Sequence, residues 1–302
     1  MAEIFSSYDY SAPVIDLHSH SNNSDGKDSP TELVENAAKA NVTVLAITDH
    51  DTTAGWSEAI RAGSRFGVRI IPGIEISTRQ RIGNHRSISV HILAYLPDPE
   101  NADLRAELTK TRSSRVNRAK KMVELLAVDY PISWAQVLAE LPEGATIGRP
   151  AIADALVTSG IVPNRSDAFT SILNSQSRYY VSDHSVSTVE AISLIRAAGG
   201  ISVIAHPLID FPPGQALQDL PAEFFSELIS AGLNGIEIDH RAVPSQAKPW
   251  LRQLALKHDL IITGSSDYHG VDGKENRLGE NSTSPKMLQR ILDQATGFEP
   301  PL

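Results

Sequence analysis

Most histidines of this 302-residue chain lie in short clusters with Asp or Glu, and the clusters follow apolar runs. Seven of the ten histidines belong to this set, while His85, His184 and His258 stand apart and are expected at the surface. The clustered positions are Asp16, His18, His20, Asp25, Asp49, His50, Asp51, Glu75, His91, His206, Glu237, His240, Asp267 and His269. The chain has no cysteine, so any metal must be held by nitrogen and oxygen, which suits zinc, manganese or iron.

The spacing inside the clusters suits chelation. Alternate residues of an extended segment point to the same side, so His18 and His20 can hold one ion together, and Asp267 and His269 repeat the spacing. A carboxylate such as Glu75 can bridge two ions, because each oxygen can serve a different metal. A single His-x-His is more often structural, but crowded acids and imidazoles would destabilise a fold unless a cation neutralised them. The sequence therefore predicts a site for several metal ions.

Predicted strands that are buried on both faces position these clusters. The apolar runs are rich in β-branched residues, as in parallel sheets, and they cover residues 14–18, 42–50, 69–75, 87–95, 201–206, 235–240 and 260–267. Helical patterns separate several runs: one begins with Ser29 as N-cap and Pro30 at the first helical position, and others cover residues 188–198 and 249–258. This alternation predicts a parallel α/β fold, and seven strands suggest a barrel whose C-terminal rim carries the site.

Residues 101–181 interrupt the alternation with a mostly helical segment. Helices are expected over residues 104–126, 134–141 and 150–159. We expect a barrel built from residues 1–100 and 182–302, with residues 101–181 as a helical insertion that forms a lid over the active site. Arg112, Arg115, Arg118 and Lys121 recur every three residues along the first of these helices. A solvated face is the default interpretation of this stripe, and a basic wall that guides a polyanionic substrate is the alternative.

Charge and hydropathy limit the classes of partner that the chain is expected to bind. The net charge of -9 makes the chain a poor non-specific binder of nucleic acid, so a nucleotide or a short RNA or DNA end would be held by local contacts. No apolar stretch approaches the length of a membrane span, and residues 1–13 lack the charged start and apolar run of a signal peptide. We expect a cytoplasmic protein with no membrane association and no obligate protein partner.

The motifs together resemble those of the polymerase and histidinol phosphatase (PHP) superfamily. The matching segments run through nearly the whole chain and are Asp16–His20 with Ser24–Gly26, Thr48–Asp51, Pro72–Glu75, Ala205–Pro207 and Ser266–Gly270. The helical insertion and the Gly148-Arg149-Pro150 motif narrow the resemblance to the bacterial group of 3′,5′-nucleotide bisphosphatases and 5′-to-3′ exoribonucleases. The resemblance implies a distorted (β/α)7 barrel with a helical insertion, and two or three divalent ions of Mn, Fe or Zn.

The family pattern also implies which residues hold each ion. The first ion would be held by His18, His20, Glu75 and Asp267, the second by Glu75, His91 and His206, and the third by Asp25, His50 and His269. Glu75 would bridge the first two ions. Asp16, Asp49 and Asp51 are expected to orient imidazoles rather than to bind metal. The sequence departs from the pattern at Ala151, where relatives often have His, and at Asp239, where they often have Tyr.

Basic residues near these motifs are candidates for phosphate contacts. Arg149 stands at a helix start, which also suits a solvent-exposed side chain, but the resemblance favours a phosphate clamp, since a planar guanidinium holds phosphate oxygens bidentately. Lys27 is either an exposed turn lysine or a phosphate contact, and Arg178 is a weaker candidate. His240 would contact phosphate or donate a proton to the leaving oxygen. Arg149 and His240 are therefore the catalytic candidates.

The expected activity is metal-dependent hydrolysis of a nucleotide phosphate ester. The predicted substrate is the 3′-phosphate of a nucleoside 3′,5′-bisphosphate, which leaves an AMP-type product, with 5′-phosphorylated oligonucleotides as a related class. A histidinol-phosphatase-like or broad-specificity phosphatase is one alternative, and an amidohydrolase, which would have a different later ligand order, is another. A non-catalytic, metal-stabilised nucleotide-binding module is the alternative from another class; open coordination positions argue against it, because structural sites are saturated by protein ligands.

Overall fold

The computed structural model describes residues 13–82, 86–141, 147–174, 176–182, 184–208, 222–271 and 273–299, so His85 and most of the N-terminal segment lie outside the described residues. The strands are β1 (Val14–Asp16), β2 (Val42–Ile47), β3 (Arg69–Ile82), β4 (Arg86–Tyr95), β5 (Val186–Ser187), β6 (Ile201–Ile204), β7 (Gly235–Asp239) and β8 (Ile261–Gly264). The helices are α1 (Pro30–Lys39), α2 (Trp56–Phe66), α3 (Ala102–Leu126), α4 (Trp134–Ala139), α5 (Arg149–Thr158), α6 (Arg165–Asp167), the π-helical turn η1 (Ala168–Ile172), α7 (Thr188–Ala197), α8 (Ala222–Ala231), α9 (Lys248–Lys257) and α10 (Pro285–Gln294).

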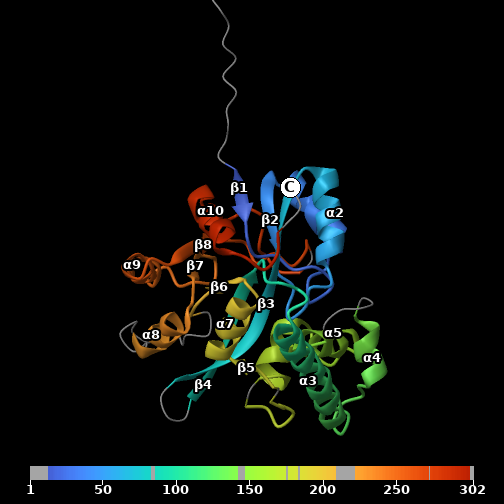
Figure 1. Ribbon diagram of the computed structural model, residues 1–302. Helices are drawn as coiled ribbons and strands as arrows, with labels where there is room; N and C mark the ends of the chain where they lie inside the picture. Colours follow the sequence, from blue (N-terminus) through green and yellow to red (C-terminus); the bar gives the residue numbers. More distant parts are fainter. Residues whose placement is uncertain are drawn as a thin grey trace, which may run out of the picture.

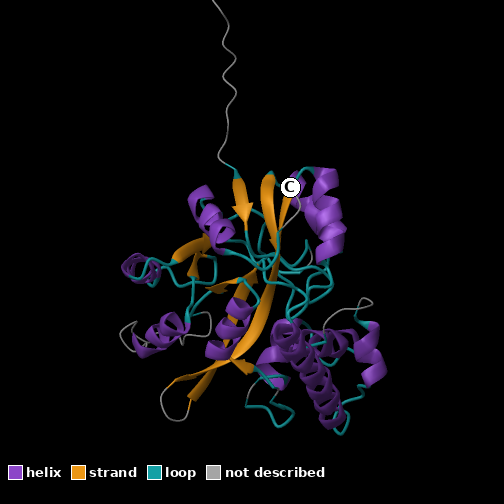
Figure 2. Ribbon diagram, in the orientation of Figure 1, coloured by secondary structure: helices purple, strands orange, loops and turns teal. Residues whose placement is uncertain are grey.

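The described strands form one mixed sheet that curls into a barrel. Its order is β1-β2-β3-β4-β6-β7-β8, with the short β5 paired to β3. The last strand returns to the first through a parallel bridge between Ser19 and Tyr268, where His20 N donates to Tyr268 O at 2.8 Å. Strands lie at the centre and helices around them (Figure 2). The seven predicted strands and the α/β barrel with its helical insertion are confirmed.

One strand runs against the expected direction. β4 pairs antiparallel with β3 over ten registered residue pairs, and antiparallel with β6 as well. The prediction of an all-parallel barrel was wrong here, because only a short link joins these two strands and a parallel crossover needs a dozen or more residues. The reversal still brings His91 to the metal rim: it lies opposite Ser77, two residues beyond Glu75.

The insertion forms helices where its sequence predicts them, in α3, α4 and α5. These helices pack around their own buried cluster, which includes Met122, Leu126, Ile152 and Leu156, while separate clusters fill the barrel. In Figure 1 they lie together at the lower right, beside the lower half of the long strand β3. The insertion therefore has a core of its own and stands next to the strand that carries Glu75.

Local sequence signals explain individual helix starts. The Ser29 side chain caps α1 by accepting a hydrogen bond from Glu32 N, and the Glu32 carboxylate accepts one from Ser29 N. This reciprocal pair is a capping box, which satisfies free N–H groups of the first turn. Asn101 caps the long helix α3 in the same manner, accepting from Leu104 N. Within the part of the chain that the structure describes, no helix is both long and apolar enough to cross a bilayer.

Candidate metal centre and substrate cavity

The Glu75 carboxylate is the hub of the predicted ligands, and its two oxygens face different imidazoles. Oε2 lies 3.2–3.3 Å from ring nitrogens of His18, His20 and His50. Oε1 lies 2.8 Å from His91 Nδ1 and 3.1 Å from His206 Nε2. Burial alone would raise the pKa of Glu75, but the surrounding imidazoles, His50 and His91 first, hold it well below its usual value. An ionised carboxylate that offers one oxygen to each side has the geometry of a bridge.

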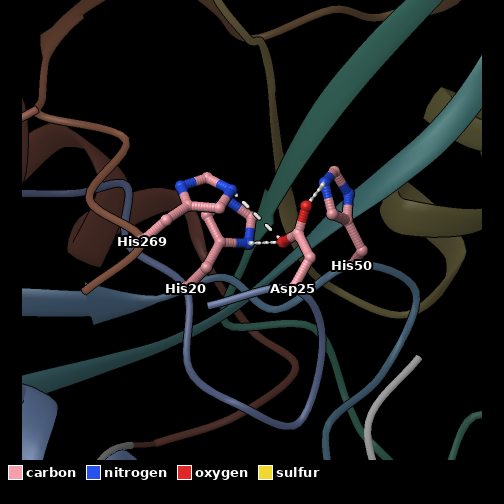
Figure 3. A group of neighbouring side chains, drawn as sticks. All are labelled: His20, Asp25, His50 and His269. Atoms are coloured by element: carbon pink, nitrogen blue, oxygen red, sulfur yellow. Dashed lines mark ion pairs between the residues drawn. The ribbon is translucent and has the colours of Figure 1, made fainter. Parts of the chain in front are cut away.

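A second carboxylate joins the imidazoles on the other side of the site. Asp25 lies between His20 and His269 on one side and His50 on the other (Figure 3). Its Oδ1 is 3.2 Å from His269 Nε2 and 3.8 Å from His20 Nδ1, and its Oδ2 is 3.9 Å from His50 Nε2. Ligand atoms of these four residues all lie within 4.8 Å of one another. They make one of three overlapping groups that could hold a metal ion; the others are His18, His20 and Glu75, and His50, Glu75 and His91.

Asp267 closes the same cluster from the last strand. Its Oδ1 is 3.3 Å from His20 Nε2 and 3.5 Å from His18 Nε2, and its Oδ2 accepts from Lys274 Nζ at 2.9 Å. Lys274 lies outside the sequence motifs, so the sequence did not predict its contact with Asp267. All nine predicted ligands thus converge on one site, although they come from strand ends spread along the chain.

Backbone positions with positive φ angles or very close packing orient these side chains toward the site. Asp51, His206 and Asp267 have positive φ angles of 53°, 24° and 56°, which residues with a Cβ adopt only when their surroundings enforce them. Gly26 packs so closely on the strand-one loop that a Cβ would lie 2.3 Å from His20 O, so only glycine can follow Asp25 here. The rim loops are held in conformations that regular strands would not adopt.

The centre contains the donors that a divalent metal requires. Several of its buried atoms have no hydrogen-bond partner within the described residues: Asp25 Oδ1, His50 Nδ1, His240 Nε2 and His269 Nε2. Burial holds the pKa of His50 well below its usual value, so its ring is neutral. Burial would raise the pKa of Asp25, but His269 and His50 outweigh it and hold that pKa well below its usual value. Ionised carboxylates beside buried imidazoles form the donor set of a divalent-metal site, so the residues present fit metal ions.

The neighbouring acids mostly hold the loops rather than the rings. Asp16 accepts from the main-chain N–H groups of Ser266 and Gly279. Asp49 accepts from the hydroxyls of Ser21 and Ser24 at 2.7 Å each, and Ser24 Oγ stands 3.4 Å from His20 Nδ1, so its link to an imidazole runs through a serine. Asp51 contacts Ser77 N and Arg115. The expectation that these three acids orient imidazoles directly therefore differs from the contacts observed.

Glu237 is the carboxylate that does orient an imidazole. Its Oε1 lies 3.1 Å from His18 Nδ1, and its Oε2 accepts from His206 N at 2.8 Å. Burial would raise the pKa of Glu237, but His18 and His240 lower it to about 2. The sequence places Glu237 at a strand end. It does not show whether such an acid binds a metal ion itself or orients a histidine that binds one.

A cavity of about 600 Å³ opens from this centre, which is the size of a small-molecule pocket. Barrel residues at its wall include Asp25, Lys27, His50 and His91. Insertion residues at its wall include Arg115, Arg118, Arg149, Phe169 and Tyr180. The guanidinium of Arg149 lies 5.5 Å from the Phe169 ring centre and 6.0 Å from that of Tyr180.

The remaining candidates fall into different surroundings. Arg178 pairs with Asp129 at 2.6 Å, is 69% exposed and does not line the cavity. His240 is buried, with Nε2 3.7 Å from Asp267 Oδ2, so it sits beside the ligands and not at the cavity wall. Lys27 lies 3.9 Å from Asp154 of the insertion. His258 is exposed, as predicted, and His184 is partly buried with its Nε2 2.6 Å from Glu107.

Three of the four residues in the basic stripe of α3, the arginines, do not lie on a solvated face, which was the default interpretation. Arg112 donates to Asp51 O, and Arg115 contacts the Asp51 carboxylate and Ser77. Arg118 donates to Val181 O at 2.7 Å and lies over the Tyr180 ring. These three arginines pack the helix against the barrel and against the end of the insertion, while Lys121, the fourth residue of the stripe, is exposed and pairs with Glu124 at 2.9 Å.

Comparison with known proteins identifies the family. The model of the PHP domain matches residues 16–131, which include the predicted ligands from His18 to His91. The 3′,5′-nucleoside bisphosphate phosphatase of Chromobacterium violaceum is 32% identical over 92% of this chain and 94% of its own length. The chain belongs to the PHP family. A 5′-3′ exoribonuclease of Haemophilus influenzae is also similar to this chain, 33% identical over 84% of it and 89% of its own length.

Solved structures agree with this PHP assignment. A protein of Bifidobacterium adolescentis assigned as a metal-dependent phosphoesterase is 41% identical, with a TM-score of 0.86 over 95% of this chain and 98% of that one. A Chromobacterium violaceum protein, solved with sulfate and without metal under the name amidohydrolase, is 30% identical, with a TM-score of 0.79 over 94% and 97% of the two chains. The full-length relatives named for an activity on phosphate esters make this PHP protein a metal-dependent phosphoesterase.

Proposed function

We propose that this phosphoesterase removes the 3′-phosphate of nucleoside 3′,5′-bisphosphates. The observation that carries the proposal is that one cavity is lined both by the metal-ligand candidates His50 and His91 and by Arg149 of the insertion. Such a cavity can bind a molecule that has one phosphate at each end. The Chromobacterium violaceum relative named for this substrate matches over nearly the whole chain.

At the inner end, the protein supplies ligands for two or three ions of Mn, Fe or Zn. The residues that would hold them are His18, His20, Asp25, His50, Glu75, His91, His206, Asp267 and His269. Bound divalent cations supply Lewis acidity toward a phosphoryl oxygen and lower the pKa of water. The chain's own part is to keep Glu75 and Asp25 ionised, to orient His18 through Glu237, and to hold the rim loops through Asp16 and Asp49.

At the outer end, Arg149 holds the second phosphate. A guanidinium binds phosphate oxygens through paired N–H donors, and that of Arg149 lies over the aromatic rings of Phe169 and Tyr180. Binding at this distant phosphate would orient the reacting one, and so raise the rate rather than only tighten binding. The insertion, residues 101–181, then acts as a lid that carries the specificity of the site.

The second candidate function is that of a 5′-3′ exonuclease, which cleaves the same type of bond. Cleaving a 5′-phosphorylated oligonucleotide after its first nucleotide breaks the 3′-oxygen–phosphorus bond that is broken in the bisphosphate. The two substrates differ only in what is esterified to the far side of the reacting phosphate. The Haemophilus influenzae relative named for the exonuclease activity supports this candidate. The metal identity and the cytoplasmic location stay predictions.

Product analysis tests the proposal. Protein reconstituted with Mn²⁺ is incubated with adenosine 3′,5′-bisphosphate and, separately, with a short 5′-phosphorylated RNA. We expect inorganic phosphate and adenosine 5′-monophosphate from the first, and nucleoside 5′-monophosphates from the second if the exonuclease candidate also holds. Release of the 5′-phosphate instead, or no turnover of the bisphosphate while other phosphomonoesters are hydrolysed, would overturn the proposed substrate.

A further inference from the structure

Arg115 reaches from the insertion into the metal rim of the barrel. It lies in the middle of α3 and is 17% exposed. Its Nη2 lies 3.1 Å from Asp51 Oδ2 and donates to Ser77 Oγ. The sequence motifs of the barrel do not predict these contacts, because Arg115 lies far from both partners in the chain, 38 positions from Ser77 and further from Asp51.

The two barrel residues that hold Arg115 are part of the metal rim. Asp51 follows His50, and its N–H donates to Glu75 O at 3.1 Å. The Asp51 Oδ1 accepts from Ser77 N at 2.9 Å, and Ser77 lies opposite His91 in the β3–β4 ladder. The guanidinium is therefore held by residues that adjoin His50 and His91, two members of one candidate ligand group.

An ion pair with a buried acid could be purely structural, but the position of Arg115 indicates more. Arg115 and Ser77 line the same cavity as His50 and His91. Within the described part of the chain, both contacts of Arg115 are made by Nη2, which leaves Nε and Nη1 for a ligand in the cavity. A guanidinium fixed in this way has donors that need no rearrangement when a phosphate arrives.

We propose that Arg115 is a catalytic residue that donates hydrogen bonds to the non-bridging oxygens of the reacting phosphate, with Asp51 and Ser77 as positioning residues. The role follows the general logic of phosphoryl transfer, where a positioned arginine neutralises charge on those oxygens. It rests on the phosphoesterase assignment but not on the nucleotide substrate. Arg149 would read the distant phosphate, whereas Arg115 would act on any phosphate ester that reaches the metals.

The chain offers a matched control for Arg115. Arg112 lies one turn earlier on the same helix and also contacts Asp51, through its main-chain oxygen, yet it does not line the cavity. Arg112→Ala removes a docking contact of the helix without removing a donor from the cavity. Comparing it with Arg115→Ala separates loss of docking from loss of a phosphate contact.

The test measures turnover and phosphate binding in the Mn²⁺-loaded protein and in these two variants. With p-nitrophenyl phosphate and a nucleoside 3′-monophosphate, Arg115→Ala should lower kcat about 100- to 1,000-fold on both substrates, in the range seen when one donor to a developing oxyanion is removed. Added guanidinium should restore part of this rate. Metal content should not change, and Arg112→Ala should stay within a few-fold of the parent protein.

Calorimetry with inorganic phosphate gives an independent measurement that needs no turnover. The dissociation constant should rise at least tenfold in Arg115→Ala and little in Arg112→Ala. Equal losses in the two variants would show that helix docking is responsible, and normal phosphate binding in Arg115→Ala would overturn the proposal. A wrong nucleotide assignment would instead leave the p-nitrophenyl phosphate and phosphate-binding results as predicted.

Discussion

Glu237 and His18 face each other inside the barrel, with the carboxylate Oε1 3.1 Å from the imidazole Nδ1 and both side chains fully buried. The ionised carboxylate accepts from Nδ1–H, so the other ring nitrogen, Nε2, is the one offered to the site. That nitrogen lies 3.3 Å from Glu75 Oε2 and 3.5 Å from Asp267 Oδ1. The pair thus fixes both the tautomer and the direction of a predicted metal ligand.

Replacing Glu237 tests this orienting role. Glu237→Gln keeps the shape but removes the charge that holds His18, so we expect metal affinity to fall about 10- to 100-fold, the usual effect of losing a carboxylate behind a histidine ligand. Isothermal titration of the metal-free protein with Mn²⁺ measures it. Asp239→Asn is the control, because Asp239 lies on the same strand but pairs with Arg252 near the surface. Unchanged affinity in Glu237→Gln would contradict the role.

Glu75 should matter to more than one ion. Its two oxygens face separate sets of imidazoles, so Glu75→Gln is expected to lower metal content by more than one ion per chain and to lower kcat accordingly. Asp25→Asn is the comparison, because Asp25 belongs to only one of the three ligand groups. Elemental analysis of the purified variants gives the metal content. Equal losses in both variants would show that Glu75 is not a bridge.

Metal removal should destabilise the fold. The buried carboxylates and imidazoles around Glu75 are mutually crowded, and a cation that binds only the folded state stabilises it by about 2.7 kcal/mol at a hundred times its dissociation constant. We therefore expect a chelator to lower the Tm and added Mn²⁺ to restore it in a concentration-dependent manner. Differential scanning calorimetry at several Mn²⁺ concentrations checks this. A Tm that is independent of metal would argue against a bound cation.

Arg149 should discriminate between substrates rather than support catalysis in general. A hydrogen bond to a charged group contributes about 1.5–3 kcal/mol, so Arg149→Ala should lower kcat/KM for the bisphosphate about 10- to 150-fold and barely change it for a 3′-monophosphate. Arg178→Ala is the control, since Arg178 belongs to the same insertion but pairs with Asp129 outside the cavity. An equal loss on both substrates would assign Arg149 to the reacting phosphate or to folding.

The strands and the ligands were predictable because both depend on local patterns. A strand buried on two faces must be apolar throughout, and polar residues at its end mark the rim, as Glu75 does after residues 69–74. The direction of β4 was not predictable from its own pattern, since an antiparallel buried strand reads the same. The signal was the short separation between Glu75 and Ser87, which leaves no room for a crossover helix.

The contacts between the barrel and the insertion could not be predicted from the sequence. The stripe of Arg112, Arg115 and Arg118 has the spacing of a solvated helix face, and only the packing of α3 against Asp51 and Val181 shows that these residues are engaged. Arg178 likewise stands next to Tyr179 and Tyr180 in sequence, but only Tyr180 of these three lines the cavity. Residues of similar type a few positions apart point to different surroundings, because the local chain conformation decides which of them faces the site.

The comparison of two substrates tests the central claim most directly. It measures kcat/KM of the Mn²⁺-loaded protein for a nucleoside 3′,5′-bisphosphate and for the matching nucleoside 3′-monophosphate. If a distant phosphate is held by Arg149, the bisphosphate should be preferred by at least about tenfold, which corresponds to about 1.4 kcal/mol of added transition-state binding. Equal kcat/KM for the two substrates would show that the second phosphate is not read, and would contradict the proposed function.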